Sequence, residues 1–220
     1  MIDLSRVDTL LLDMDGTLLD LHFDDHFWLQ YMPANLPENH GFDAHQMQTH
    51  FYEPMQSTRG SLDWYCVDHW SERLDLPVMQ DMARHRHLIR WRPGTTDFLR
   101  LARKAGKRII IATNAHREVW QLKADTLDLI HRVDAVVSSH DYGKPKEDGH
   151  FWQSIVDQYQ LDLTRCAFFD DSDAVLASAV RHGVGLVVGI EHPNSHRPAR
   201  TLEHAPVIRD FSDLIPVLRA

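Results

Sequence analysis

The chain has 220 residues, of which 43% are hydrophobic and 25% are charged, and its formal net charge is −9. This length allows one sizeable core, or a core with a smaller inserted domain. The negative charge argues against a general nucleic-acid surface, and no apolar stretch approaches the roughly 20 residues that a membrane span needs.

The N-terminal residues 1–6 do not have the layout of a signal peptide, because the first apolar run leads directly into acidic residues. A cytoplasmic protein is therefore expected. The two cysteines, Cys66 and Cys166, lie far apart and in no metal-ligand spacing, so both are interpreted as packing residues. The 16 histidines are scattered, and the tightest pair, His85 and His87, has no acidic or cysteine neighbours that would favour a metal site.

An apolar run from Thr9 to Leu12 ends in two aspartates, Asp13 and Asp15, and a Gly16-Thr17 pair follows. This pattern predicts a buried parallel strand with carboxylates at its carboxyl end. Side chains two positions apart along a strand point the same way, so both carboxylates are expected on one side. Because an unpaired carboxylate is costly to remove from water, the stretch predicts a cation near these acids.

Residues 20–92 differ in character and are predicted to form a helical insertion. The segment has no β-branched run, and its aromatic residues recur at helix-like intervals between prolines and glycines. These aromatics are Phe23, Phe27, Trp28, Tyr31, Phe42, Phe51, Tyr52, Trp64, Tyr65 and Trp70. The cluster from Trp64 to Trp70 could stack a flat base, although such clusters more often pack helices together.

Strands and helices alternate from Arg92 onward. Thr95 or Thr96 is expected to cap the first helix, which ends at Gly106. The next elements are strands at 108–114, 134–139, 166–172 and 185–190, helices at 116–127, 146–160 and 174–182, a possible sixth strand at 207–208 and a terminal helix at 211–218.

This alternation predicts right-handed βαβ crossovers and a parallel sheet that is covered on both faces. The fold class is therefore α/β, with a Rossmann-like core formed by residues 1–19 and 93–220. Residues 20–92 are the inserted helical domain.

Polar residues follow four of the predicted strands, at the edge where ligands bind in parallel sheets. They are Asp13 and Asp15, Thr113 and Asn114, the Lys144-Pro145-Lys146 turn, and Asp170 and Asp171. In this order they resemble the four motifs of the haloacid dehalogenase (HAD) superfamily of phosphatases. The resemblance covers the core throughout, and the insertion lies where type C1 caps sit in that superfamily.

The resemblance implies hydrolysis of a phosphomonoester through an aspartyl-phosphate. Asp13 is the expected nucleophile, and Asp15 is expected to protonate the leaving oxygen and then to take a proton from the hydrolytic water. The alternative for this pair is a helix cap or a structural metal site. The hydroxyl of Thr113 and the backbone N–H of Asn114 would bind the phosphoryl group, although the two residues also fit an ordinary helix cap.

A lysine completes the expected catalytic set. The family pattern places it about six residues before an aromatic residue, which favours Lys146, six positions before Trp152, as the residue that binds the phosphoryl group. The residue six positions after Lys144 is His150, so Lys144 fits the pattern less well and is expected to be a surface lysine.

Mg²⁺ is the implied cofactor, since it prefers hard oxygen ligands. The resemblance assigns these to Asp13, the backbone carbonyl of Asp15, and the pair Asp170 and Asp171. Adjacent residues of a strand point to opposite faces, so one acid of that pair is expected to bind directly, with Asp171 favoured. The alternative is a solvated acidic helix start at Ser172.

The acid at position 15 favours phosphoryl transfer over carbon–halogen cleavage, because the dehalogenases of the superfamily lack it. Leu10 to Leu21, the Trp64-Tyr65-Cys66 segment and Pro145 to Asp148 together resemble the bacterial purine nucleotidases that act on GMP and IMP. The expected partner is therefore a small phosphorylated metabolite, such as a nucleotide. A sugar-phosphate phosphatase or a phosphoglucomutase-like enzyme is the alternative, followed by a non-catalytic binding module and a histidine-based metal regulator.

Overall fold

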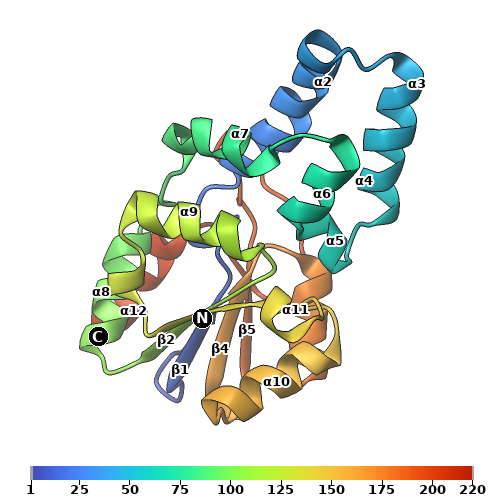
Figure 1. Ribbon diagram of the computed structural model, residues 1–220. Coiled ribbons are helices and arrows are strands. Elements are labelled where there is room, and N and C mark those ends of the chain that lie inside the picture. The colour runs from blue at the N-terminus through green and yellow to red at the C-terminus, as the bar shows by residue number, and fades with distance from the viewer. Residues whose placement is uncertain (1, 220) are drawn as a thin grey trace.

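A six-stranded parallel sheet is the centre of the computed structural model, which describes residues 2–219 (Figure 1). Its strand order is β3-β2-β1-β4-β5-β6. The strands are β1 (Thr9–Leu12), β2 (Arg108–Thr113), β3 (Ala135–Ser138), β4 (Cys166–Asp170), β5 (Leu186–Ile190) and β6 (Val207–Ile208). The predicted α/β class is confirmed, and all six predicted strands are present.

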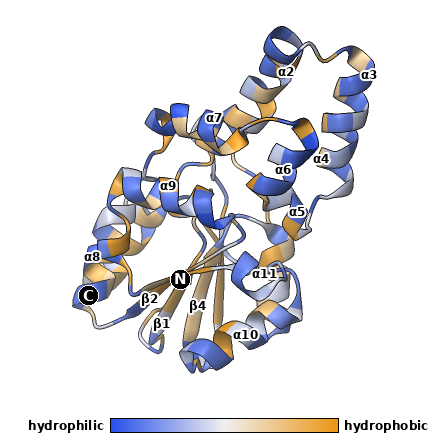
Figure 2. Cartoon of the chain, viewed as in Figure 1, coloured by the Kyte–Doolittle hydropathy of each residue, from blue (hydrophilic) through white to orange (hydrophobic). Residues whose placement is uncertain are grey.

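Helices cover both faces of the sheet, because successive residues of a buried strand point to opposite sides. Leu10 and Leu12 of β1 belong to one apolar cluster, and Leu11 belongs to the other. The first cluster includes α8 (Thr95–Lys104), α9 (Arg117–Leu127) and α12 (Ile215–Arg219), and the second includes α10 (Gly149–Tyr159) and α11 (Asp173–Arg181). Hydrophobic residues accordingly concentrate on the strands, while hydrophobic and hydrophilic residues alternate along the helices (Figure 2).

The register of the central strands aligns their carboxyl ends. Leu12 pairs with Ile111 of β2 and with Phe169 of β4. The backbone N–H of Asp13 then donates to the carbonyl of Phe169 at 2.9 Å. The residues that follow these three strands therefore meet at one edge of the sheet.

The chain between β1 and β2 first forms a helical insertion, defined here as residues His22 to Leu88. It contains α1 (His22–His26), π-helical turn η1 (Phe27–Tyr31), α2 (Met32–His40), α3 (Ala44–Gln46), π-helical turn η2 (Met47–Tyr52), α4 (Glu53–Ser57), α5 (Leu62–Tyr65), α6 (Val67–Leu74), α7 (Val78–Arg84) and 3₁₀ turn η3 (Arg86–Leu88). These elements stand above the carboxyl ends of the strands (Figure 1). The two chain segments that join the insertion to the core run side by side. The Asp20 N–H donates to the Arg90 carbonyl, and the Arg92 N–H donates to the Leu18 carbonyl.

Two local predictions were wrong. Thr95 does not cap α8: Gly94, with a φ of 74°, precedes the helix, and the Thr95 hydroxyl donates instead to the Leu18 carbonyl at 3.2 Å. The helix expected from Lys146 begins only at Gly149, with Asp148 as its N-cap. The residues before it form a turn that carries Lys146 toward the strand ends.

Short 3₁₀ turns connect several of the core elements. They are η4 (Ile130–Arg132), η5 (Ser139–Tyr142), η6 (Leu163–Arg165) and η7 (Phe211–Leu214). The last of them replaces the first half of the expected terminal helix. Within residues 2–219, no helix combines the length and apolar character that crossing a membrane requires.

Candidate active site

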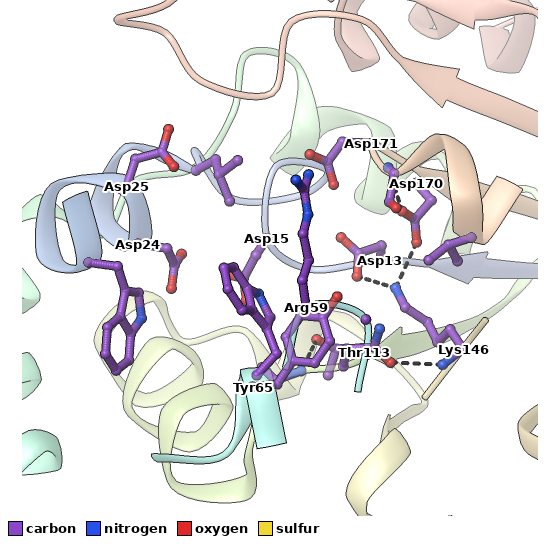
Figure 3. Close-up of a pocket in the computed structure, with 18 of the residues that line it drawn as sticks. Asp13, Asp15, Asp24, Asp25, Arg59, Tyr65, Thr113, Lys146, Asp170 and Asp171 are labelled. Atoms are coloured by element: carbon purple, nitrogen blue, oxygen red, sulfur yellow. Dashed lines mark hydrogen bonds and ion pairs between the residues drawn. The ribbon is translucent and has the colours of Figure 1, made fainter. Parts of the chain in front are cut away.

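The side chain of Lys146 lies between two aspartates at the centre of the strand ends (Figure 3). Its Nζ donates to Asp13 Oδ1 at 2.5 Å and to Asp170 Oδ2 at 2.7 Å. Lys146 is only 2% exposed, and both acids are buried as well. The structure thus brings together three residues that lie far apart in the sequence.

Two hydrogen bonds to the backbone of Lys146 fix the turn that carries it. Trp152 Nε1 donates to the Lys146 carbonyl at 2.9 Å, and the Lys146 N–H donates to Asn114 Oδ1 at 2.9 Å. The first bond gives a physical reason for the six-residue spacing between the lysine and an aromatic residue. Lys144 instead lies at the surface, 3.9 Å from Asp148.

Asp171 reaches the same site from the start of the loop after β4. One carboxylate oxygen from each of Asp13, Asp170 and Asp171 lies within 4.8 Å of the others. Gly16 permits this approach, because a Cβ at position 16 would come within 2.7 Å of the Asp171 Cγ, and its φ of 82° is also unfavourable for other residues. Arg200 Nη1 lies 3.2 Å from the outer oxygen of Asp171.

Burial and mutual repulsion make the ionised forms of these acids unfavourable unless a positive charge lies nearby. Burial raises the pKa of Asp13, the acids Asp170 and Asp171 raise it further, and Lys146 opposes the rise. Burial and Asp170 raise the pKa of Asp171 to about 7. Burial alone would lower the pKa of Lys146, but Asp13 and Asp170 outweigh this effect, so its pKa is raised. Three convergent carboxylates with hard oxygen donors fit a divalent cation such as Mg²⁺.

Asp15 lines the same cavity but contacts a different lysine. Lys123 of α9 places its Nζ 2.7 Å from Asp15 Oδ1 and 2.7 Å from Asp24 Oδ1 of α1. Strand β1 ends at Leu12, so the strand rule that predicted a common direction for Asp13 and Asp15 does not extend to them. The side chain of Asp15 is not part of the carboxylate cluster formed by the other three acids.

Lys123 was not among the site residues predicted from the sequence, although a signal was present. Lys123 lies four residues after Val119, on the face of α9 that is buried, and it is 1% exposed. A lysine on an apolar helix face needs a paired acid, because a buried unpaired charge is costly. Here burial and Asp15 raise the pKa of Asp24 to about 7, and Lys123 opposes the rise.

Thr113 ends β2, Asn114 follows it, and both residues line the cavity. The Thr113 Oγ1 accepts the backbone N–H of Ala115 at 3.0 Å, which leaves the hydroxyl proton free to be donated to a ligand. The Asn114 side chain holds the lysine turn through Lys146 N–H and Glu147 Oε2. Asn114 therefore positions Lys146, a role that its place before a helix did not reveal.

The acids open into a cavity of about 590 Å³ that the insertion covers. Trp28, Arg59, Trp64 and Tyr65 line it from the insertion, and Figure 3 shows Arg59 extending into it. Trp70 does not line it: this side chain is buried and its Nε1 donates to the Trp64 carbonyl at 3.1 Å. The aromatic cluster thus divides into residues that face the cavity and one that packs helices. Arg59, in the loop after α4, carries no sequence signal that we recognised.

Comparison with known proteins agrees with this architecture. The chain is 34% identical over 212 residues to the GMP/IMP nucleotidase YrfG of Escherichia coli (strain K12), and 96% of each chain is covered. A HAD phosphatase from Thermococcus onnurineus superposes with a TM-score of 0.78 at 20% identity, covering 96% of this chain and 98% of that chain. The L-2-haloacid dehalogenase of Xanthobacter autotrophicus superposes with a TM-score of 0.68 at 15% identity, covering 97% and 99%.

At these low identities the two solved structures establish the fold alone. The family comparison goes further, because residues 7–183 match the haloacid dehalogenase-like hydrolases. Together with the identity to the nucleotidase over nearly the full length, this shows that the chain belongs to the haloacid dehalogenase-like hydrolase family.

Proposed function

We propose that this hydrolase is a Mg²⁺-dependent phosphatase that acts through an aspartyl-phosphate on Asp13, and that its substrates are purine nucleoside monophosphates such as GMP and IMP. The observation that carries the proposal is the buried Lys146 between Asp13 and Asp170 at the floor of a cavity. The purine nucleotide is suggested by the 34% identity to the E. coli enzyme, which is named for GMP and IMP.

Asp13 would attack the phosphorus atom, forming an O–P bond as the bond to the leaving oxygen breaks. Lys146 supports this step because it orients the Asp13 carboxylate and places positive charge where the phosphoryl oxygens would lie. The hydroxyl of Thr113 and the backbone N–H of Asn114 would donate to the same oxygens. All of these groups belong to the sheet edge, which holds them in a fixed arrangement.

Asp15 would serve as acid and then as base. It donates a proton to the leaving nucleoside oxygen, and it later takes a proton from the water that attacks the phosphorus of the aspartyl-phosphate. That second step releases inorganic phosphate and restores the Asp13 carboxylate. Lys123 would hold Asp15 in position between these two proton transfers, since the two groups form an ion pair at 2.7 Å.

Mg²⁺ would be held by Asp13, Asp171 and the backbone carbonyl of Asp15, with Asp170 alongside. When bound, it would neutralise phosphate charge and so permit attack by an anionic nucleophile. Asp170 is engaged on both oxygens, by Lys146 Nζ and by the Ser172 N–H at 2.8 Å. Among residues 2–219, the side chain of Asp171 has one hydrogen-bond partner, the exposed Arg200. This difference supports Asp171 as the acid that binds the cation directly and Asp170 as the one that orients Lys146.

The insertion would act as the cap that selects the substrate. Trp28, Trp64 and Tyr65 present aromatic surface to the cavity, and flat bases stack on such surface. Arg59 adds a cation on the same side, which would suit the carbonyl-rich edge of a guanine or hypoxanthine base. Closing the insertion over the leaving group would also exclude water from the aspartyl-phosphate.

A substrate panel with Mg²⁺ tests the proposal. Release of inorganic phosphate is measured for GMP, IMP, AMP, pyrimidine nucleotides and sugar phosphates, and we expect the highest kcat/KM for GMP and IMP. Preference for a sugar phosphate would overturn the nucleotidase assignment but leave the phosphatase mechanism intact. Dependence on a sugar bisphosphate activator would indicate a mutase, and no hydrolysis of any ester would favour a binding module.

A further inference from the structure

A second cluster of metal-ligating side chains lies apart from the acidic site. It consists of Cys66 between α5 and α6, His116 before α9, and His140 in the turn η5 after β3. One ligand atom from each residue lies within 4.8 Å of the other two. Cys66 belongs to the helical insertion, whereas both histidines belong to the core.

Both histidines carry a buried nitrogen that the fold leaves without a partner. His116 Nδ1 and His140 Nε2 make no hydrogen bond within the described part of the chain, although each is closed off from solvent. A buried polar atom without a partner is uncommon and calls for an explanation. The two rings are 5.0 Å apart and nearly perpendicular at 87°, so they do not stack on each other.

The opposite nitrogen of His116 faces a carboxylate. Its Nε2 lies 3.5 Å from Asp68 Oδ2. A ligating histidine commonly binds the metal with one nitrogen and contacts a carboxylate with the other, which fixes the ring and its tautomer. In a metal site of this kind His116 would bind the ion through the unpartnered Nδ1, and Asp68 would orient the ring through Nε2.

Cys66 lies at the N-terminus of the eight-residue helix α6, and its Sγ accepts the backbone N–H of His69 at 3.5 Å. This contact fixes the sulfur atom beside the two histidines. The residue is partly exposed, so an ion in solution can reach it, whereas Cys166 is buried in β4.

We propose that Cys66, His116 and His140 form a binding site for a transition-metal cation of the Zn²⁺ class. Thiolate and imidazole ligands favour Zn²⁺, while the carboxylates around Asp13 favour Mg²⁺, so the two sites differ in the cation they select. Three protein ligands and one water complete the tetrahedron that Zn²⁺ prefers. The sequence interpretation of Cys66 as a packing residue did not anticipate this cluster, because its members are far apart along the chain.

The bound cation would link the insertion to the core. Tyr65 and Ala115, the neighbours of Cys66 and His116, both line the cavity. In this structure the three ligands meet where the insertion stands over the strand ends. Occupation of the site would therefore hold the cavity in its covered form and slow the opening that substrate exchange needs.

Co²⁺ is the probe that tests the site, because a cobalt–thiolate bond produces a charge-transfer absorption that carboxylates cannot give. The full chain is titrated with Co²⁺ in a large excess of Mg²⁺, which occupies the acidic site. We expect a thiolate band that saturates at about one equivalent of Co²⁺ and that Zn²⁺ abolishes by competition. The absence of this band would overturn the proposal.

Single substitutions identify the residues that bind the Co²⁺ responsible for the charge-transfer band. Cys66→Ser and His140→Asn should remove it or weaken Co²⁺ binding at least about tenfold, and Asp68→Asn should weaken binding by roughly tenfold. Cys166→Ser and Asp13→Asn should leave the band unchanged. A band that survives in Cys66→Ser, or that is lost in Cys166→Ser, would contradict the assignment.

A measurement on the unmodified chain covers the case in which a variant does not fold. Alkylation of Cys66 by iodoacetamide is followed by peptide mass spectrometry, with and without Zn²⁺ and always with Mg²⁺. We expect Zn²⁺ to slow modification of Cys66 at least about tenfold, since a coordinated thiolate is a poor nucleophile. Equal rates with and without Zn²⁺ would refute the site, and neither outcome depends on which phosphate ester the enzyme hydrolyses.

Discussion

Two buried lysines pair with acids that line the cavity, and the two clusters differ in structural origin. Lys146 pairs with Asp13 and Asp170, which all belong to the sheet edge. Lys123 pairs with Asp15 of the same edge but also with Asp24 of the helical insertion. The first cluster lies entirely within the core, whereas the second adds Asp24 of the insertion to the pair that Lys123 forms with Asp15.

The difference indicates how one fold can keep its chemistry while its substrate changes. Groups that would handle the phosphoryl transfer are fixed by parallel strands, and groups that would contact the rest of the substrate come from loops and helices of the insertion. Variants of the core residues and of the lysine that reaches the insertion test this division.

Asp13→Asn should abolish turnover, with a loss of at least about a thousandfold in kcat, because an amide cannot form the aspartyl-phosphate. Circular dichroism should show an intact fold. Activity near that of the unmodified enzyme would refute the assignment of the nucleophile.

Lys146→Ala should reduce kcat/KM by about a hundredfold, since it removes the cation that faces Asp13 and the phosphoryl oxygens. Lys144→Ala is the matched control and should change it less than about twofold, because Lys144 is exposed and its contact with Asp148 is weak. Steady-state kinetics of the two variants shows which of the two lysines contributes to catalysis. A larger effect at Lys144 would show that the turn is assigned wrongly.

Lys123→Met should lower kcat by about tenfold, because Asp15 loses the ion pair that positions it. Asp24→Asn removes only the contact with the insertion and should cost less than about threefold in kcat. Comparing the two variants separates positioning of Asp15 from attachment of the insertion. Equal losses would mean that Lys123 acts only through the insertion.

Mg²⁺ affinity should rise with pH between 6.5 and 8.0. The pKa of Asp171 is about 7 without the cation, so below that pH a proton competes for the carboxylate, and above it the carboxylate is ionised. For one competing proton the expected gain is about fourfold. Calorimetric titration of Mg²⁺ at the two pH values measures it, and an affinity that falls with rising pH would exclude a role for Asp171.

The core could be predicted from the sequence because its signals are local. The central strands are apolar runs, and four strand ends carry the polar residues that the structure brings together at the sheet edge. The six-residue spacing between Lys146 and Trp152 also favoured the lysine that the structure places between the acids. This spacing corresponds to the hydrogen bond from Trp152 Nε1 to the Lys146 carbonyl.

The insertion was predictable as helical but not in its contacts. Lys123 meets Asp24, and Cys66 meets His116 and His140, only after distant segments pack together. No periodic pattern in the sequence predicts these contacts between distant residues. The start of α10 was also missed, because Asp148 caps the helix and releases Lys146 into a turn.

Trapping the phosphorylated enzyme tests the central claim most directly. The unmodified enzyme is mixed with GMP and Mg²⁺ and quenched in acid during turnover, and its peptides are analysed by mass spectrometry. Capture by Asp13 predicts one phosphate on the peptide that contains Asp13, which mild alkali removes. Phosphate on a different residue, or phosphate released in a burst from an enzyme that is never phosphorylated, would contradict it.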